Sequence, residues 1–205
     1  MRKCTRLLVV YGTSGVLLFG SALPARAIDI VPFAGFRFGG DLGTQPGNGV
    51  VGPTSVTIDS SVSYGGVVDI PLSQPHALEF YYSHQPTKLS GSSAVGDVTM
   101  NVLHVGLVDT LPSADQQLSW LLIGTVGATQ LSARDSSATR PSIGLGGGVE
   151  WTATEHIGLR GDLRALLAFT GSGGGSASCG GGCSVSFHGS LLAQGELSIG
   201  VVARF

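Results

Sequence analysis

The sequence predicts an all-β fold, an eight-stranded antiparallel up-and-down transmembrane β-barrel, from three observations. Every second residue from Leu197 to Phe205 is apolar, and the residues between them are small or polar except Val202. Seven further segments carry strand-like patterns separated by turn-forming residues. Past residue 27 we find no run of about 18 apolar residues that would make a membrane-spanning helix. Because strand side chains point alternately to opposite faces, alternation accounts for a chain that is hydrophobic without such a helix.

The composition agrees with this fold class. Charged residues make up 12% of the chain, about half the usual level, there are 33 glycines, and the mean hydropathy is +0.34. One face of each strand would meet lipid and the other the barrel interior. The net charge of −2 and the absence of a basic block argue against nucleic acid as a partner.

The beginning of the chain predicts export. A basic start and an apolar stretch that ends at Leu23 precede the A-x-A site Ala25-Arg26-Ala27. We therefore expect a signal peptide, residues 1–27, that is cleaved before Ile28 and is followed by one barrel domain, residues 28–205. An uncleaved membrane anchor is the alternative, and the short apolar run and well-formed cleavage site disfavour it.

We expect eight strands, each long enough to cross a bilayer at the tilt of a barrel. Their connections tend to alternate between long and short, as is typical of barrels with loops on one side and tight turns on the other. The expected ranges are Asp29–Gly40, Ile58–Ile70, Ala77–Gln85, Asp97–Thr110, Leu118–Leu131, Pro141–Trp151, Ile157–Phe169 and Val185–Phe205.

The seventh predicted strand tests the membrane interpretation best. Arg160, Asp162 and Arg164 share one face, and only apolar residues or glycine occupy the other. A charge on the lipid face at mid-bilayer would cost about 2–4 kcal/mol, and none is present there. The fourth and fifth strands alternate poorly, because Leu121 and Ile123 fall on the face that should be polar. Their registers stay open.

Aromatic residues fall near strand ends, as the two aromatic belts of a membrane barrel require. We place Phe80, Trp120, Trp151 and Phe205 toward one interface and Phe38, Phe169 and Phe187 toward the other. A soluble β-sandwich or a lipocalin-like barrel is the alternative, with the same apolar faces turned into a core. The export signal, the terminal phenylalanine and the aromatic placement favour the membrane.

The glycine-rich segment Ile143–Trp151, followed by the charged segment Ile157–Arg164, resembles the sixth and seventh strands of small outer-membrane barrels. That broad group includes the OmpA, OmpW and opacity-protein barrels. The resemblance covers the mature chain in pattern and implies a monomer in the lipid of the bacterial outer membrane. No peptidoglycan-binding domain is expected after the barrel. The resemblance also implies that the barrel-assembly machinery is a partner and reads the terminal pattern Leu197, Ile199, Val201, Ala203 and Phe205.

Charged residues predict a filled interior. An eight-stranded barrel is just wide enough for its own side chains, so inward charges should pair with one another. The predicted lumen network consists of Glu79, Glu150, Arg160, Asp162, Arg164, Glu196 and Arg204. A narrow or gated pore is the alternative to a lumen filled by these paired side chains.

Cys179 and Cys183, which flank three glycines, are predicted to form a disulfide because an exported chain meets an oxidising compartment. Cys4 leaves with the signal peptide. A metal site would need more ligands, and His188 is the nearest candidate, so neither a metal nor a cofactor is predicted.

One candidate for catalysis is His188-Gly189-Ser190, with Glu196 at the same strand parity. It resembles the His-x-Ser arrangement of a barrel lipid A deacylase, in which the serine is the nucleophile. The short spacing to Glu196 and an inferred inward face favour ordinary strand residues. His84 and His104 have no acid or nucleophile at a persuasive spacing, and we predict no enzyme.

The leading functional hypothesis is a structural or surface-interaction role. Loops carry function in barrels of this kind, but here they lack clustered aromatic or basic residues, so no surface ligand can be named. The alternatives are a narrow channel for small or apolar solutes, a lipid-modifying barrel and a soluble lipocalin-like binding protein.

Overall fold

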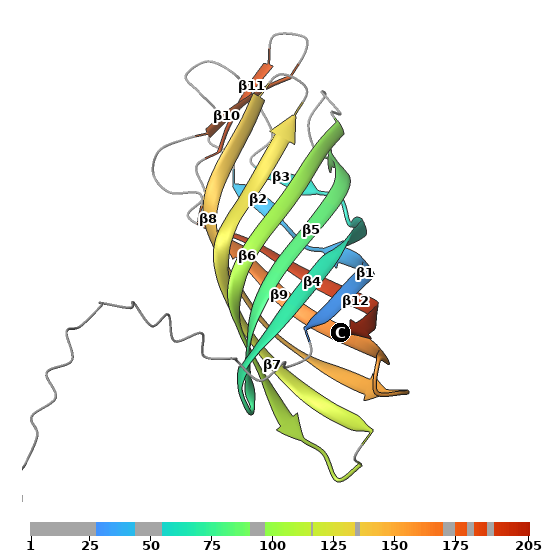
Figure 1. Cartoon of the computed structure of the whole chain (residues 1–205). Helices are drawn as coiled ribbons and strands as arrows, with labels where there is room; N and C mark the ends of the chain where they lie inside the picture. Colours follow the sequence, from blue (N-terminus) through green and yellow to red (C-terminus); the bar gives the residue numbers. More distant parts are fainter. Residues whose placement is uncertain are drawn as a thin grey trace, which may run out of the picture.

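The computed structural model describes residues 28–43, 55–90, 97–115, 117–133, 136–169, 175–179, 183–187 and 191–205 (Figure 1). The predicted signal peptide, residues 1–27, and the candidate residues His188 and Ser190 lie outside this part of the chain. No helix long and apolar enough to cross a membrane occurs among the described residues.

Eight strands form a closed antiparallel ring in the order β1, β4, β5, β6, β7, β8, β9 and β12. Pairing of β1 with β12 closes the ring, and each strand otherwise pairs with its neighbours along the chain. Their bounds are Asp29–Phe38, Ser61–Ser73, His76–Ser90, Asp97–Pro112, Leu118–Ala133, Ser136–Thr152, Ile157–Ala168 and Leu192–Arg204. The eight-stranded up-and-down barrel predicted from the sequence is confirmed.

Two strand pairs are added to the barrel. Strands β2 (Asp41–Gly43) and β3 (Ser55–Ile58) pair with each other, and β3 continues onto β5. Strands β10 (Gly175–Cys179) and β11 (Cys183–Phe187) form a separate two-stranded sheet. Figure 1 shows β10 and β11 at the end of the barrel far from the C-terminus, which we call the loop end. The opposite end is the turn end.

The two ends of the barrel domain meet at the turn end, as an even number of strands requires. The Ile28 backbone N–H donates to the Phe205 carbonyl at 3.0 Å, and the Phe205 N–H donates back to Ile28 at 3.1 Å. The ladder between β1 and β12 therefore continues to the last residue.

Several predicted boundaries near the loop end are wrong. Ile58 belongs to β3, so β4 begins at Ser61, and β5 continues past the predicted end at Gln85 to Ser90. Val185 to Phe187 belong to β11, so the last barrel strand begins at Leu192 rather than at Val185. The segment 132–140, predicted as a loop, is mostly strand, because β7 and β8 pair out to Ala133 and Ser136. Serine, threonine and alanine dominate there, and the paired backbone, rather than apolar alternation, carries the strands onward.

The barrel is apolar outside and charged inside. Each strand of the ring exposes at least one large apolar side chain, including Phe36, Val62, Phe80, Leu103, Leu122, Leu145, Leu163 and Ile199. Arg37, Glu79 and Glu196 are fully buried in the interior. A soluble barrel buries the first set and exposes the second, so this distribution is opposite to the lipocalin-like alternative.

The structure also explains why the pattern is weak in β6 and β7. Leu121 and Ile123 point inward and form a small apolar cluster with Val108. Leu107 and Leu122 face outward on the same two strands. Apolar residues thus occupy both faces near the turn end, and period-two alternation in polarity disappears although the strands are regular.

Glycines at two places permit geometry that other residues do not. Gly39 and Gly40 have φ values of 79° and 116° and end β1, and the Gly40 carbonyl accepts the Ile58 N–H at 2.9 Å. Gly148 on β8 faces the lumen, where a Cβ atom would lie 2.2 Å from Asp162 Oδ1 and 2.7 Å from the Gly161 carbonyl. The glycine on β8 therefore leaves the space that the charged side chain on β9 occupies.

We predict that Gly148→Ala destabilises the barrel by about 1–3 kcal/mol, because the added methyl group must displace Asp162 or the strand itself. The measurement is the free energy of urea unfolding of the barrel refolded into lipid vesicles. Gly124→Ala is the matched control, since a Cβ at this site on β7 meets nothing within 4 Å. Equal stability of the two variants would contradict the close-approach explanation.

Candidate functional site: the charged lumen

The centre of the lumen holds a five-residue ion-pair cluster. Arg160 contacts three carboxylates: Nη1 lies 2.6 Å from Asp69 Oδ2, Nη2 lies 2.8 Å from Glu79 Oε2, and Nε lies 2.9 Å from Asp162 Oδ1. Arg164 donates from Nη1 to Glu79 Oε1 at 2.6 Å and from Nη2 to Asp162 Oδ2 at 2.9 Å. Each guanidinium thus bridges carboxylates, which compensates for removing the charges from water.

Period-two geometry and ring order bring these charges together. Residues 160, 162 and 164 of β9 share the inward face, and Glu79 projects inward from β5. In the ring, β5 and β9 are separated by three strands in either direction, so they lie opposite each other. The bonds from Arg160 and Arg164 to Glu79 therefore span the lumen and brace its two walls.

A second group surrounds Glu196 on β12. Arg37 Nη2 lies 2.6 Å from Glu196 Oε2 and also donates to Ser83 Oγ at 2.6 Å. The Tyr81 hydroxyl donates to the other carboxylate oxygen of Glu196, and the Ser83 hydroxyl donates to Oε2 at 3.0 Å. The Glu196 carboxylate is thus fully engaged inside the barrel, where its side chain is completely buried.

Tyr81 joins the two groups. The Arg164 guanidinium carbon lies 4.5 Å from the centre of the Tyr81 ring, a cation–π contact in a desolvated setting. Phe33 stacks on the same ring with centroids 5.7 Å apart. The central cluster and the Glu196 group are therefore one connected layer rather than a set of independent pairs.

A third group lies at the turn end. Arg204 donates to Asp29 through Nε and Nη2, both at 2.9 Å, and to Glu150 Oε1 at 2.7 Å. These side chains are partly exposed, with 29% of the Arg204 side chain accessible. The group links β1, β8 and β12 next to the point where the ring closes.

The seven residues predicted as one lumen network therefore fall into three groups. Glu79, Arg160, Asp162 and Arg164 lie together, Glu196 lies in the second group, and Glu150 and Arg204 lie at the turn end. Sequence reasoning missed the partners Arg37, Asp69, Asp29 and Tyr81. Strand parity was the available signal, since Asp69 shares its parity with Ser61 and Ser63, and Tyr81 shares that of Glu79.

Neutral hydrogen bonds line the wall of the lumen that β6, β7 and β8 form, across from Glu196 on β12. His104 on β6 lies between Ser142 Oγ, 2.7 Å from Nε2, and Thr125 Oγ1, 3.0 Å from Nδ1. The Thr129 hydroxyl donates to Ser142 at 2.8 Å. Among the described residues no carboxylate is hydrogen-bonded to His104, whose partners are two hydroxyl groups rather than an acid.

Apolar clusters border the polar layer at both ends. Near the loop end, Ile58, Val98, Met100, Ala168 and Leu192 pack together. Near the turn end, Val108, Leu121 and Ile123 do the same. The central cluster and the Glu196 group therefore lie between two apolar layers inside the barrel, whereas the partly exposed Arg204 group lies at the turn end.

Other predicted site residues are placed as follows. Leu197, Ile199 and Val201 are exposed on the outer face of β12, and Ala203 is half-buried on the same face. Phe205, directly after β12, is exposed as well. The backbone ladder pairs Cys179 with Cys183, and the disulfide between them stays a prediction. Among the described residues, no group of three or more His, Cys, Asp or Glu is arranged to hold a metal ion.

The closed ring, the apolar exterior and the filled lumen together define a small barrel of the outer-membrane type. No family model and no curated protein sequence matches this chain. Solved structures do match: Neisserial surface protein A has a TM-score of 0.60 at 13% identity, with 87% of this chain and 97% of that chain covered.

Two further solved structures share the fold. The outer membrane protein OprG from Pseudomonas aeruginosa has a TM-score of 0.58 at 10% identity, covering 88% of this chain and 96% of its own. The outer membrane protein AlkL has a TM-score of 0.54 at 14% identity, covering 98% and 97%. At these identities the similarity establishes the fold, which is that of small eight-stranded outer-membrane β-barrels.

We predict that Arg164→Ala destabilises the barrel by about 3 kcal/mol or more, because it leaves Glu79 and Asp162 without one of their buried cationic partners. Urea unfolding in lipid vesicles measures the loss. Arg204→Ala is the control at the partly exposed turn-end group, where we expect a smaller loss. A loss for Arg164→Ala no larger than for Arg204→Ala would contradict a structural role for the central cluster.

Proposed function

We propose that the mature chain spans the bacterial outer membrane as a monomeric barrel with a structural or surface-interaction role and a lumen closed by its own side chains. The observation that carries the proposal is the combination of a large apolar exterior with cross-lumen ion pairs. In lipid, a closed ring satisfies the backbone hydrogen-bonding groups of every strand, and the exposed apolar residues contact hydrocarbon chains instead of water.

The height of the apolar surface supports this placement. On β7, the outward side chains from Trp120 to Ala128 are apolar or glycine, and the next outward residue is Gln130. The nine residues from Trp120 to Ala128, at the rise of a tilted strand, span about 20–25 Å along the membrane normal, which is close to the height of the apolar band of outer-membrane barrels. Exposed aromatic residues at both ends, such as Trp120 and Trp151 at one and Phe38 and Phe169 at the other, fit the two interfaces.

The same lumen argues against the narrow-channel alternative. An ion or solute would have to pass the Arg160 and Arg164 bridges to Glu79 and displace charges that are buried and already paired. Breaking such pairs without replacing them costs several kcal/mol each. A closed lumen leaves the outer surface and the loops as the parts that meet other molecules.

We predict that the full-length protein, expressed in a Gram-negative host, appears in the outer-membrane fraction with a heat-dependent shift in SDS gels. Purified and inserted into planar bilayers, it should show no single-channel conductance, and Arg164→Ala should open none. A steady conductance in the unaltered protein, reduced by changing the lumen charges, would favour the channel. A soluble β-rich species in the periplasm would refute the membrane proposal.

The proposed role of the terminal strand in assembly can be separated from a role in stability. Phe205 is 77% exposed, so its ring contributes little to the folded barrel. We predict that Phe205→Ala changes the unfolding free energy of refolded protein by less than about 0.5 kcal/mol. The amount that reaches the outer membrane of growing cells should nevertheless fall severalfold.

The matched control is Phe169→Ala, which removes another exposed outward-facing ring at the loop end of the barrel. It should leave the assembled amount unchanged. Immunoblotting of outer-membrane fractions measures both variants. Equal assembly of Phe205→Ala and the unaltered chain would refute the assembly signal.

A further inference from the structure

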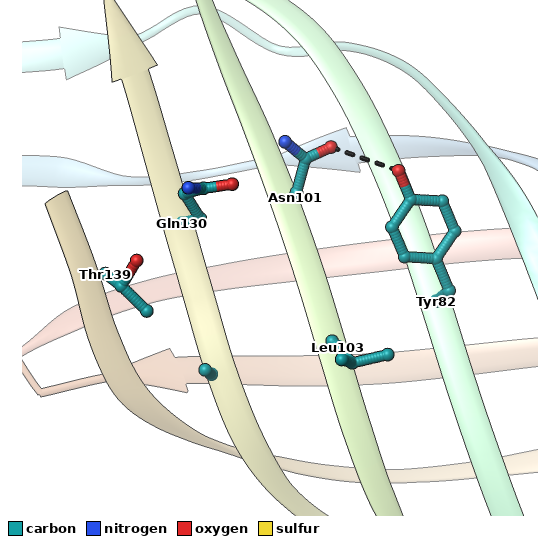
Figure 2. A pocket seen from close by; sticks show the side chains of 6 residues that line it. Tyr82, Asn101, Leu103, Gln130 and Thr139 are labelled. Carbon is teal, nitrogen blue, oxygen red and sulfur yellow. Dashed lines mark hydrogen bonds between the residues drawn. The ribbon is translucent and has the colours of Figure 1, made fainter. Parts of the chain in front are cut away.

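A hollow of about 360 Å³ lies on the outer wall of the barrel, on strands β5 to β8. It is lined by Tyr82, Asn101, Leu103, Ala128, Gln130 and Thr139 (Figure 2). Ala128 lies opposite Leu103 in the strand ladder, and its short side chain leaves the depression. None of the six lining side chains is charged, although four of them are polar.

The polar side chains form a continuous row across four strands. His84 pairs with Asn101, Asn101 with Gln130, and Gln130 with Thr139 in the β-ladder. The row adjacent to it on the turn-end side is Tyr82, Leu103 and Ala128, paired in the same order. The hollow therefore has hydrogen-bonding groups along its loop-end edge and apolar side chains below them.

Hydrogen bonds inside the row orient one amide toward the hollow. The Tyr82 hydroxyl donates to Asn101 Oδ1 at 3.3 Å, and His84 Nδ1 lies 2.7 Å from the same oxygen. Figure 2 shows the Asn101 nitrogen turned away from Tyr82 and toward Gln130. Because the oxygen is used on one side, the two N–H donors of Asn101 remain available on the other.

Gln130 and Thr139 complete the set of available groups. Both are exposed, and neither side chain makes a hydrogen bond with another residue in the described part of the chain. In hydrocarbon an unsatisfied amide costs several kcal/mol. The row lies where the apolar surface of β7 ends, so headgroups rather than acyl chains reach it.

We propose that this hollow binds a membrane lipid with an uncharged, hydroxyl-bearing headgroup. The hydroxyl groups would bond to Asn101, Gln130 and Thr139, and the first part of an acyl chain would lie on Leu103 and Ala128. The absence of a cationic side chain from the lining disfavours a phosphate as the main contact. The inference rests on the proposed membrane placement.

The test uses the mature barrel in phosphatidylcholine nanodiscs doped with increasing monogalactosyldiacylglycerol. Side-chain amide resonances of Asn101 and Gln130 report occupancy by NMR, and they should shift and saturate. Ala128→Leu fills the hollow and should weaken the apparent affinity about tenfold. The control Val126→Leu enlarges the next outward residue of β7, which does not line the hollow, and should leave the affinity unchanged.

Three outcomes would overturn the inference. The amide resonances do not shift, Ala128→Leu binds as well as Val126→Leu, or free methyl galactoside shifts the resonances at the same concentration, which would identify a soluble saccharide site. Insertion into the nanodiscs is checked first by the heat-dependent gel shift. Failure to insert overturns the membrane proposal, whereas insertion without these shifts overturns only the lipid site.

Discussion

Closure of the sheet by β1 and β12 is the constraint on which the rest of the structure depends. It satisfies the backbone groups that an open edge would leave unpaired, and in lipid no water is available to satisfy them instead. With eight strands, closure also fixes an interior that only side chains can fill. Every inward residue must then match its neighbours in size and charge, because the ring cannot widen to accommodate a mismatch.

The charges of β9 show how this constraint acts on the sequence. Arg160, Asp162 and Arg164 need both opposite charges and space, and different strands supply them. Glu79 and Asp69 supply charge from across the lumen. Gly148 of the neighbouring β8 supplies space, because a Cβ there would collide with Asp162. The glycines of β8 and the charged side chains of β9 therefore pack together, because the missing side chains on β8 leave room for the charged ones on β9.

The sequence predicted most of the fold because every outward residue of a lipid-facing strand has to be uncharged and mostly apolar. In β9 every outward residue is apolar or glycine. The prediction failed where this pattern does not apply. In β6 and β7 the inner face is itself apolar near the turn end, so Leu121 and Ile123 obscured the register. Beyond the apolar surface, the segment 132–140 has no large apolar residue in its sequence and therefore resembles a loop. The partner Asp69 required knowledge of which strands face each other across the ring. The partner Arg37 required the register of the closing pair β1 and β12, in which it lies opposite Glu196. Parity alone contains neither.

The strands of the barrel differ in length, so the wall is taller on one side, and the two sides present different residues at the loop end. Strands β5 to β8 have 15, 16, 16 and 17 residues, whereas β1, β9 and β12 have 10, 12 and 13. On the short side the outward residues stay apolar to the strand ends, as Leu167 near the end of β9 and Phe169 directly after it show. On the tall side the four strands β5 to β8 continue past the apolar surface, and the row from His84 to Thr139 lies where the outward residues change from apolar to polar. In the proposed membrane placement, a wall that extends beyond the apolar band presents regularly spaced polar groups, held by strand pairing, at the level of the headgroups. This ordered wall therefore has the preorganisation that lipid recognition needs.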